Sequence, residues 1–222
     1  ARASEIVRLG AEKNVPVHFK ELREMEAVLP GTNHQGFVAF SETFTYTDLE
    51  DLIEQSRQGP GWALLLVADH ITDEGNLGAL IRTAAFFGVH GLILPKDRSV
   101  KRSSGAFISV PVCRVVNLGR ALDLLAEKGF WIIGAAGEAR ESIHHFDWQR
   151  DAVLALGSES KGLSLSVRDR CHALVKIPGS GRVESLNVSV AGGVILSEIF
   201  RQRGDQGGGL EAKPIKRKWE TR

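Results

Sequence analysis

Two polar side chains, Ser185 and Asn187, stand where a glycine-rich loop meets an apolar helical pattern in this chain of 222 residues. A strand-like run at 173–177 precedes the loop, and the helical pattern begins at Leu186. The first turn of a helix carries N–H groups without main-chain partners, so junctions of this kind bind small polar ligands. The alternative is a plain connection in which Ser185 or Asn187 only caps the helix.

A second pair of chemically active side chains, Asn76 and Arg82, belongs to a helical pattern at 77–87 that follows an apolar run at 62–68. Asn76 stands at the predicted helix start, where an amide caps free N–H groups. Arg82 interrupts a pattern that otherwise faces a core, and a buried unpaired charge is costly, so a partner is expected. The alternative is a surface arginine whose stem covers apolar residues.

A third polar group, Glu159, follows directly after the buried run 152–156 and Gly157. Ligands of parallel sheets bind beyond the carboxyl ends of strands, and Glu159 falls at such an edge. The order of residues around Lys161 is not that of a phosphate-binding Walker loop, and no Gly-x-Gly-x-x-Gly follows a strand. The adjacent His144 and His145 point apart without a matching cluster, so we expect no metal site.

Strand-like and helix-like periods alternate from residue 62 onward, which predicts an α/β domain with a mostly parallel sheet. The runs expected as strands are apolar throughout, as in strands covered on both faces. Strands are expected at 62–68, 91–94, 110–116, 130–136, 152–156 and 173–177, and helices at 77–87, 118–128, 165–170 and 186–203.

Residues 1–40 have a different pattern, with helices expected at 4–13 and 20–28 and short strands at 15–19 and 36–40. So few elements make a poor independent core. We therefore expect part of a small α/β domain at 1–40. It is followed by a linker at 41–61 whose helix spans 48–57 with Thr47 as cap, a main domain at 62–203 and a flexible basic tail at 204–222.

Bulk composition restricts the classes of protein that the chain can represent. Its 28 basic and 27 acidic side chains nearly balance, so binding of a polyanion depends on local clusters of charge. Two cysteines cannot form a disulfide framework and suit a reducing cytoplasm. No apolar run approaches about 20 residues, so we expect a soluble cytoplasmic protein that does not enter a membrane.

The three polar segments, taken together and in this order, resemble the SpoU/TrmH family of the SPOUT class of S-adenosyl-L-methionine-dependent RNA 2′-O-ribose methyltransferases. The similar motifs are 76–88, 156–162 and 177–189, and the resemblance covers about 64–203. Residues 33–36 with the preceding helix resemble the end of the small substrate-binding domain of the bacterial 23S rRNA guanosine branch, of which about half is present. The stretch 96–111 is shorter than in that family. The rRNA branch is therefore favoured over the tRNA branch.

The resemblance implies a fold feature that periodicity does not reveal, a deep trefoil knot at the C-terminal end of the sheet, which general topology rules would reject. In such proteins S-adenosyl-L-methionine lies bent within the knot and is held by the backbone of three loops. The cofactor-binding positions implied here are Gly157, Ile177 and Leu186, with Gly137 and Glu138 close by.

The resemblance also implies a mechanism in which Arg82 acts on the ribose hydroxyl. A guanidinium stays protonated in ordinary settings, so its role as a literal base and its role in stabilising a developing alkoxide both stay open. Asn76, Glu159, Ser185 and Asn187 would orient Arg82 and the target nucleotide. The methyl donor is consumed as cosubstrate, and no metal is required.

A homodimer is expected from the last helical pattern, which holds more apolar residues than one core-facing stripe requires. These residues are Val188, Val190, Val194, Ile195, Leu196 and Ile199. The family is generally dimeric, with its active site near the interface. Besides a tRNA ribose methyltransferase, two other classes stay open: a catalytically silent knotted RNA-binding module and an unrelated enzyme acting on a small nucleotide.

Overall fold

The computed structural model describes residues 2–31, 34–40, 45–96, 110–158 and 161–204. The expectations for Asn33, Glu159, the tail beyond residue 204 and most of the stretch 96–111 therefore lie outside the described residues. The chain divides into two compact units, Ala1–Phe44 and Thr45–Arg222, and each is described by itself.

The first unit contains helices α1 (Arg2–Glu12) and α2 (Leu22–Val28), close to the two expected helices. The strands expected at 15–19 and 36–40 are wrong, because neither segment forms a strand. The segment after α1 folds back on that helix instead: the Val15 N–H donates to the Gly10 carbonyl at 2.8 Å. Val17 packs so closely on Gly10 that a Cβ there would lie 2.5 Å from its Cγ2.

The second unit is built on a seven-stranded sheet in the order β3-β2-β1-β6-β4-β7-β5, with every neighbouring pair parallel. The mostly parallel α/β architecture expected from the sequence is confirmed. Six strands coincide with expected runs, whereas the two-residue edge strand β5 was not anticipated. The strands are β1 (Leu64–Asp69), β2 (Gly91–Pro95), β3 (Val112–Val115), β4 (Trp131–Ala135), β5 (Glu141–Ser142), β6 (Ala152–Gly157) and β7 (Ala173–Lys176).

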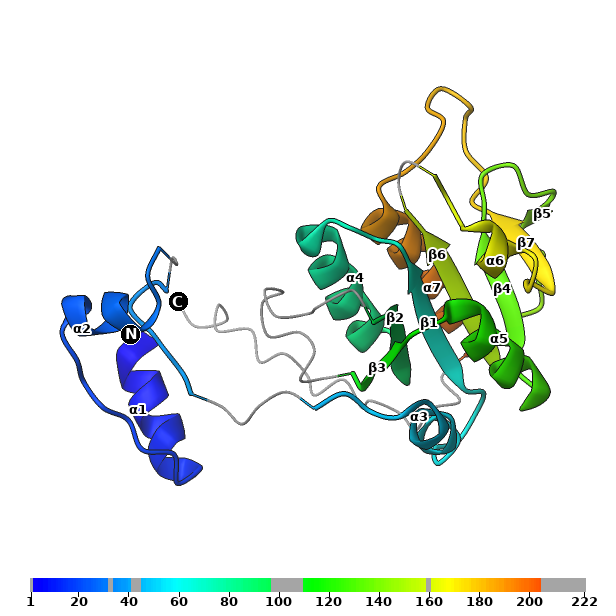
Figure 1. Cartoon of the computed structure of the whole chain (residues 1–222). Helices are drawn as coiled ribbons and strands as arrows, with labels where there is room; N and C mark the ends of the chain where they lie inside the picture. The colour runs from blue at the N-terminus through cyan, green and yellow to red at the C-terminus, as the bar shows by residue number, and fades with distance from the viewer. Residues whose placement is uncertain (1, 32–33, 41–44, 97–109, 159–160, 205–222) are drawn as a thin grey trace, which may run out of the picture. The chain divides into compact units, whose positions relative to one another are not determined.

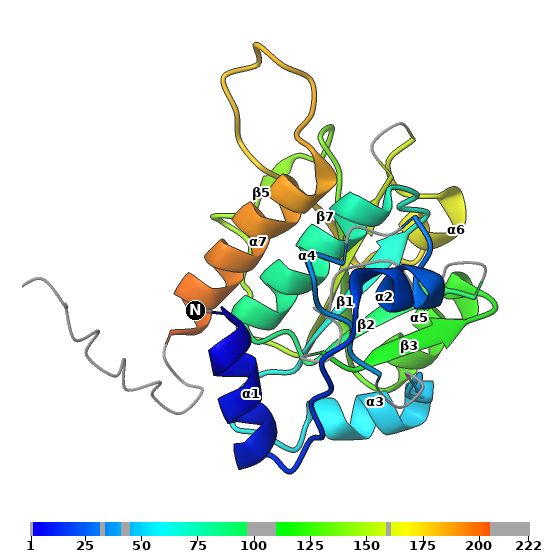
Figure 2. The same cartoon turned by 90° about the vertical axis from the view of Figure 1, so that its left-hand side faces the viewer.

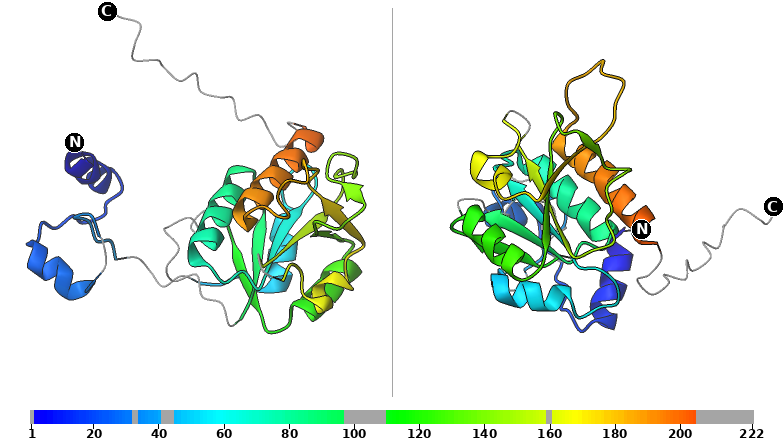
Figure 3. Two further views of the ribbon diagram at one scale, coloured as in Figure 1. Left: turned by 90° about the horizontal axis from the view of Figure 1, so that it is seen from above. Right: turned by 90° about the vertical axis from the view of Figure 1, so that its right-hand side faces the viewer.

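Helices cover both faces of the sheet (Figures 1 and 3). On one face lie α4 (Glu74–Phe86) and α7 (Val188–Arg203), side by side in Figure 2. On the other lie α3 (Leu49–Ser56), α5 (Leu118–Glu127) and α6 (Leu165–Arg168). Successive residues of β1 enter opposite cores, with Leu66 facing α4 and α7 and Leu65 facing α3 and α5. This double burial explains the unbroken apolar runs.

Helix starts differ from the expected ones in an instructive way. Asp73, not Asn76, caps α4, and its Oδ1 accepts from the Asn76 N–H at 2.7 Å, because the helix starts earlier than its apolar pattern. Asp48, not Thr47, caps α3: the Asp48 side chain accepts from the Glu50 N–H at 2.9 Å, whereas the Thr47 N–H donates to the Val112 carbonyl at the start of β3. Asn187 caps α7, as one reading of the sequence allowed.

Candidate cofactor site and catalytic residues

The carboxyl ends of β6, β4 and β7 lie next to one another at one edge of the sheet. Gly134 of β4 is level with Ala155 of β6, and Ala135 is level with Val175 of β7. The strands are parallel, so the residues that follow them gather at the same edge. The structure thereby brings together four of the positions implied for the cofactor: Gly157, Gly137, Glu138 and Ile177.

The turn after β6 depends on a glycine. Ser158 and Gly162 exchange two main-chain hydrogen bonds of 3.1 and 2.9 Å, and Gly162 adopts the left-handed conformation at φ +66°. The turn folds back so tightly that a Cβ on Gly157 would lie 2.1 Å from the Gly162 carbonyl carbon. Only glycine fits at this strand end.

The loop between β7 and α7 leaves its main chain open. Within the described part of the chain, no hydrogen bond between two main-chain groups involves residues 178–186, and the main chain of this loop makes one bond to a side chain, from the Arg182 N–H to the Ser180 Oγ at 3.5 Å. The side chains of Ser185 and Leu186 are exposed. The carbonyl oxygen of Glu184 lies 3.8 Å from where a Cβ of Gly137 would stand, so this loop approaches the loop after β4. Free N–H and C=O groups are thus presented close to the strand ends.

Glu138 already has a partner. Its carboxylate forms an exposed ion pair with the guanidinium of Arg168 on α6. The hydrogen bond from Arg168 is the largest cause that lowers the pKa of Glu138 below its usual value. The pair links the loop after β4 to α6, so the side chain of Glu138 is engaged with the protein.

A hydrogen bond joins the first turns of the two helices on the same face of the sheet. The Nδ2 of Asn187 donates to the Oδ1 of Asn76 at 2.9 Å. The Oδ1 of Asn187 meanwhile accepts from the Ser189 N–H at 2.9 Å as the helix cap. The structure therefore brings Asn76 and Asn187 together, although they are 111 positions apart.

Arg82 points away from the core of α4, whose buried stripe includes Leu77, Ile81 and Ala84. Its side chain is exposed, and its guanidinium has no hydrogen bond or ion pair with any described residue. Of the two readings of Arg82, the structure matches the surface one, and the expected buried partner is wrong. An exposed guanidinium remains available to a ligand, and its catalytic role stays a prediction.

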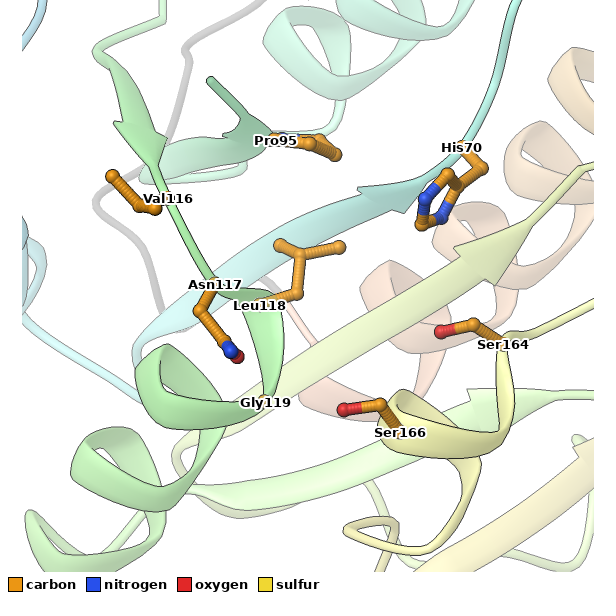
Figure 4. Close-up of a pocket in the computed structure, with 8 residues that line it drawn as sticks. All are labelled: His70, Pro95, Val116, Asn117, Leu118, Gly119, Ser164 and Ser166. Atoms are coloured by element: carbon orange, nitrogen blue, oxygen red, sulfur yellow. The ribbon is translucent and has the colours of Figure 1, made fainter. Parts of the chain in front are cut away.

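A cavity of about 310 Å³ lies at the same sheet edge on the side of α5 and α6. His70, Asn117 and Ser164 are among the residues around it (Figure 4). None of the side chains singled out in the sequence lines it.

His70 is held there by Asp69, which is fully buried: Nδ1 of His70 lies 2.5 Å from its Oδ1, and its Oδ2 accepts from the Ser164 N–H at 2.6 Å. The sequence signal that could have indicated this site is an Asp-His pair at the end of a buried strand. The backbone of His70 adopts the left-handed conformation, at φ +56°.

The described residues can also be compared with the requirements of a metal site and of a membrane-spanning helix. No group of three or more His, Cys, Asp or Glu side chains among the described residues is arranged to hold a metal ion. His144, one of the adjacent histidines, lies 3.3 Å from Glu198 instead. None of the described helices combines the length and apolar character needed to cross a membrane.

Comparison with known proteins agrees with the motifs in this fold. The model of the SpoU rRNA methylase family matches residues 63–197, and the chain belongs to this family. It is 42% identical over 212 residues to the 23S rRNA (guanosine-2′-O-)-methyltransferase RlmB of Pseudomonas putida, covering 91% of this chain and 84% of that protein. The protein of the same name from Neisseria meningitidis is 40% identical over 211 residues, covering 91% and 83%.

Solved structures give the same result. The SpoU methyltransferase AviRb of Streptomyces viridochromogenes, crystallised with the cofactor AdoMet, superimposes with a TM-score of 0.61 at 29% identity. The match covers 68% of this chain and 61% of that one. The family resemblance drawn from the three motifs is thereby confirmed.

Proposed function

We propose that the chain transfers the methyl group of S-adenosyl-L-methionine to the ribose 2′-hydroxyl of a guanosine in 23S rRNA. The RlmB relatives carry that activity in their names. The observation in this molecule that carries the proposal is the hydrogen bond between Asn187 and Asn76. It joins the first and third motifs at the sheet edge where the second motif ends.

The residues at the strand ends fit S-adenosyl-L-methionine. Backbone groups of Gly157, Ile177 and Leu186 would hold it, with Gly137 and Glu138 beside them, and the open main chain of 178–186 supplies the unused donors and acceptors. When bound, the cofactor supplies a methyl group already activated by a sulfonium. The trefoil knot of the family belongs to this proposal, and the approach of Glu184 to Gly137 supports it.

The protein's own task is to position the ribose hydroxyl and manage its proton. Arg82 carries an exposed guanidinium on α4. The hydrogen bond between Asn76 and Asn187 joins the first turn of this helix to that of α7. Because a guanidinium is a cation that donates hydrogen bonds, we assign Arg82 the stabilisation of negative charge developing on the 2′-oxygen. Ser185 and Glu159 complete the set that orients the nucleotide.

A homodimer forms a further part of the proposal. The outward stripe of α7 exposes Val190, Val194 and Phe200, and Phe86 of α4 is 79% exposed. Phe200 lies with its ring centroid 5.9 Å from that of Phe87 at the end of α4, so the apolar surface continues from one helix to the other. Such a surface suits a second copy of the chain.

The remaining assignments are organisational. Residues 1–40 are assigned to a partial RNA substrate-binding domain, 41–61 to a linker with a helix, 62–203 to the methyltransferase domain and 204–222 to a basic tail. We also assign the protein to the cytoplasm, where its RNA substrate is found. The free thiols of Cys113 and Cys171 are compatible with that location.

The test measures transfer of labelled methyl groups to rRNA beside the affinity for S-adenosylhomocysteine. Arg82→Ala should reduce transfer by at least about 100-fold with little change in affinity, since electrostatic stabilisation at one position typically contributes that much. Arg82→Lys should also fail, because a point charge does not reproduce the planar fork. Arg120→Ala, on α5 across the sheet, is the matched control and should keep its activity.

Other outcomes would redirect the assignment. Methyl transfer to tRNA but not to rRNA would identify the tRNA branch. Binding of S-adenosylhomocysteine without transfer to either RNA would identify a silent RNA-binding module. A folded Arg82→Ala protein with wild-type turnover would refute the mechanism while leaving the family membership intact.

A further inference from the structure

The guanidinium carbons of three arginine side chains of the second unit lie over aromatic rings, which is a favourable cation–π arrangement. Distances from the guanidinium carbon to the ring centroid are 4.5 Å for Arg57 over Phe130, 4.7 Å for Arg114 over Tyr46 and 4.3 Å for Arg150 over Trp131.

Two of these arginines are neutralised by the protein itself. The Nε of Arg57 lies 2.9 Å from Oδ2 of Asp151, and the Nη2 of Arg150 lies 2.5 Å from Oδ2 of Asp147. Stacking and ion pairing together fix each guanidinium, so neither is free to accept an external anion.

Arg114 differs from both in its charge partner. Its Nε, like that of Arg150, is buried from solvent and has no hydrogen-bond acceptor. No carboxylate among the described residues forms an ion pair with it. A charged donor withdrawn from water without a partner raises the free energy of the free protein, and an anion that completes the pair removes that cost. Arg114 is thus a cation that lies over an aromatic ring and has no anionic partner in the part of the chain that the structure describes.

The position of Arg114 relates it to the proposed active site. It lies on the edge strand β3, level with Leu94 of β2. Leu94 and Val112 face the core beneath α4 and α7, and side chains alternate along a strand, so Arg114 stands on that same face. This is the face of the sheet that carries α4 with its exposed Arg82.

We propose that Arg114, placed over the ring of Tyr46, binds a phosphodiester group of the RNA substrate. The inference rests on the proposed function and adds to it a contact to the RNA backbone from the face of the sheet that carries α4. Contact with the ring holds the guanidinium in place, and because the Nε is buried, the two Nη groups are the ones that would donate to phosphate oxygens. A phosphate contact positions the RNA and carries no sequence information.

The experiment compares Arg114→Gln with Arg57→Gln, which removes the same charge from another stacked arginine that already has its partner. Dissociation constants for transcribed 23S rRNA and for poly(U) are measured over a range of salt concentrations. Loss of one phosphate contact should weaken binding by about tenfold at low salt and reduce the slope of log K against log[salt] by about 0.7–0.9. Arg57→Gln should remain within about twofold of wild type, and both variants should keep the wild-type affinity for S-adenosylhomocysteine.

The two proposals fail in different ways. A wild-type protein that does not methylate rRNA refutes the proposed function, and the salt slope with poly(U) still decides the phosphate contact. An unchanged slope and affinity in Arg114→Gln overturn the inference even where methylation of rRNA is established. Should Arg114→Gln not fold, Arg114→Lys serves instead. Arg114→Lys is expected to keep the slope of log K against log[salt] but to bind RNA several-fold more weakly. Wild-type affinity in that variant would overturn the proposed contact of the guanidinium with phosphate.

Discussion

Gly157→Ala offers the sharpest structural test of the strand-end site, because the crowding is against backbone. The added Cβ would lie 2.1 Å from the Gly162 carbonyl carbon and 2.3 Å from both the Gly162 oxygen and the Leu163 nitrogen. Carbon atoms pack at about 3.5–4.0 Å, so the turn must move by more than about 1 Å. Overpacking of this kind typically costs about 1–3 kcal/mol.

The free energy needed to move this turn should appear mainly as a loss of affinity for S-adenosylhomocysteine, because the turn belongs to the proposed cofactor site. A penalty of about 1.4–2.8 kcal/mol weakens binding of S-adenosylhomocysteine by about 10- to 100-fold. Calorimetric titration of the purified variant measures it, and a thermal melt checks the fold.

Gly59→Ala is the matched control, because a Cβ there meets nothing within 4 Å and the residue precedes β1, outside the loops of the proposed site; its affinity should stay within about twofold. A Gly157→Ala protein that binds with the wild-type dissociation constant would refute the placement of the site.

Two further predictions concern α7. The guanidinium of Arg203 donates to four carbonyls at the opposite end of the sheet, including that of Trp62 at 2.8 Å, and desolvation lowers its pKa only to about 10, so it stays charged. Arg203→Met should therefore lower the free energy of unfolding by about 2–4 kcal/mol in urea denaturation, and an unchanged midpoint would contradict this reading. The pKa of the buried Glu198 is lowered from 4.5 to about 2, and the largest cause is the hydrogen bond from Arg201. The ionised carboxylate therefore stabilises the folded protein at pH values above 4.5, and this stabilisation is lost as the pH falls from about 4.5 through about 2. Unfolding of Glu198→Gln should consequently depend less on pH in that window than unfolding of wild type, and parallel pH profiles would argue against it.

The sequence predicted the sheet well because its strands are buried on both faces. Every residue of β1 and β2 is buried, and Asp69 at the end of β1 is the one charged residue in these two strands. The two-residue strand β5 has no such signature, since its residues are an exposed Glu141 and a half-buried Ser142 that join the sheet only by pairing with β7. The strands expected at 15–19 and 36–40 were wrong for the opposite reason: apolar residues were present, but among the described residues neither segment pairs with another strand.

Individual site residues were predictable where their chemistry is local and not where it depends on distant segments. Asn187 caps the helix that follows it, which the sequence indicates directly. Asn76 was expected to cap its own helix, yet its side chain meets Asn187 from the other helix. Arg114 shows the same limit, because its ring partner Tyr46, and the lack of a carboxylate partner among the described residues, are properties of the folded chain.

The order of the strands has a consequence for how the chain acquires its structure. β1 lies inside the sheet, between its successor in the chain, β2, and the much later strand β6. The hydrogen bond from the Ala63 N–H to Asp151, beside the pairing of β1 with β6, spans 88 positions. Because β1, β2 and β3 are close in the sequence, they can pair early. The other edge of β1 stays unpaired until β6 has been synthesised and has folded against it. Pairing over such a separation is intrinsically slow and leaves an apolar strand edge uncovered during the delay. We therefore expect refolding to be limited by closure of the β1–β6 pair, with aggregation competing at high protein concentration.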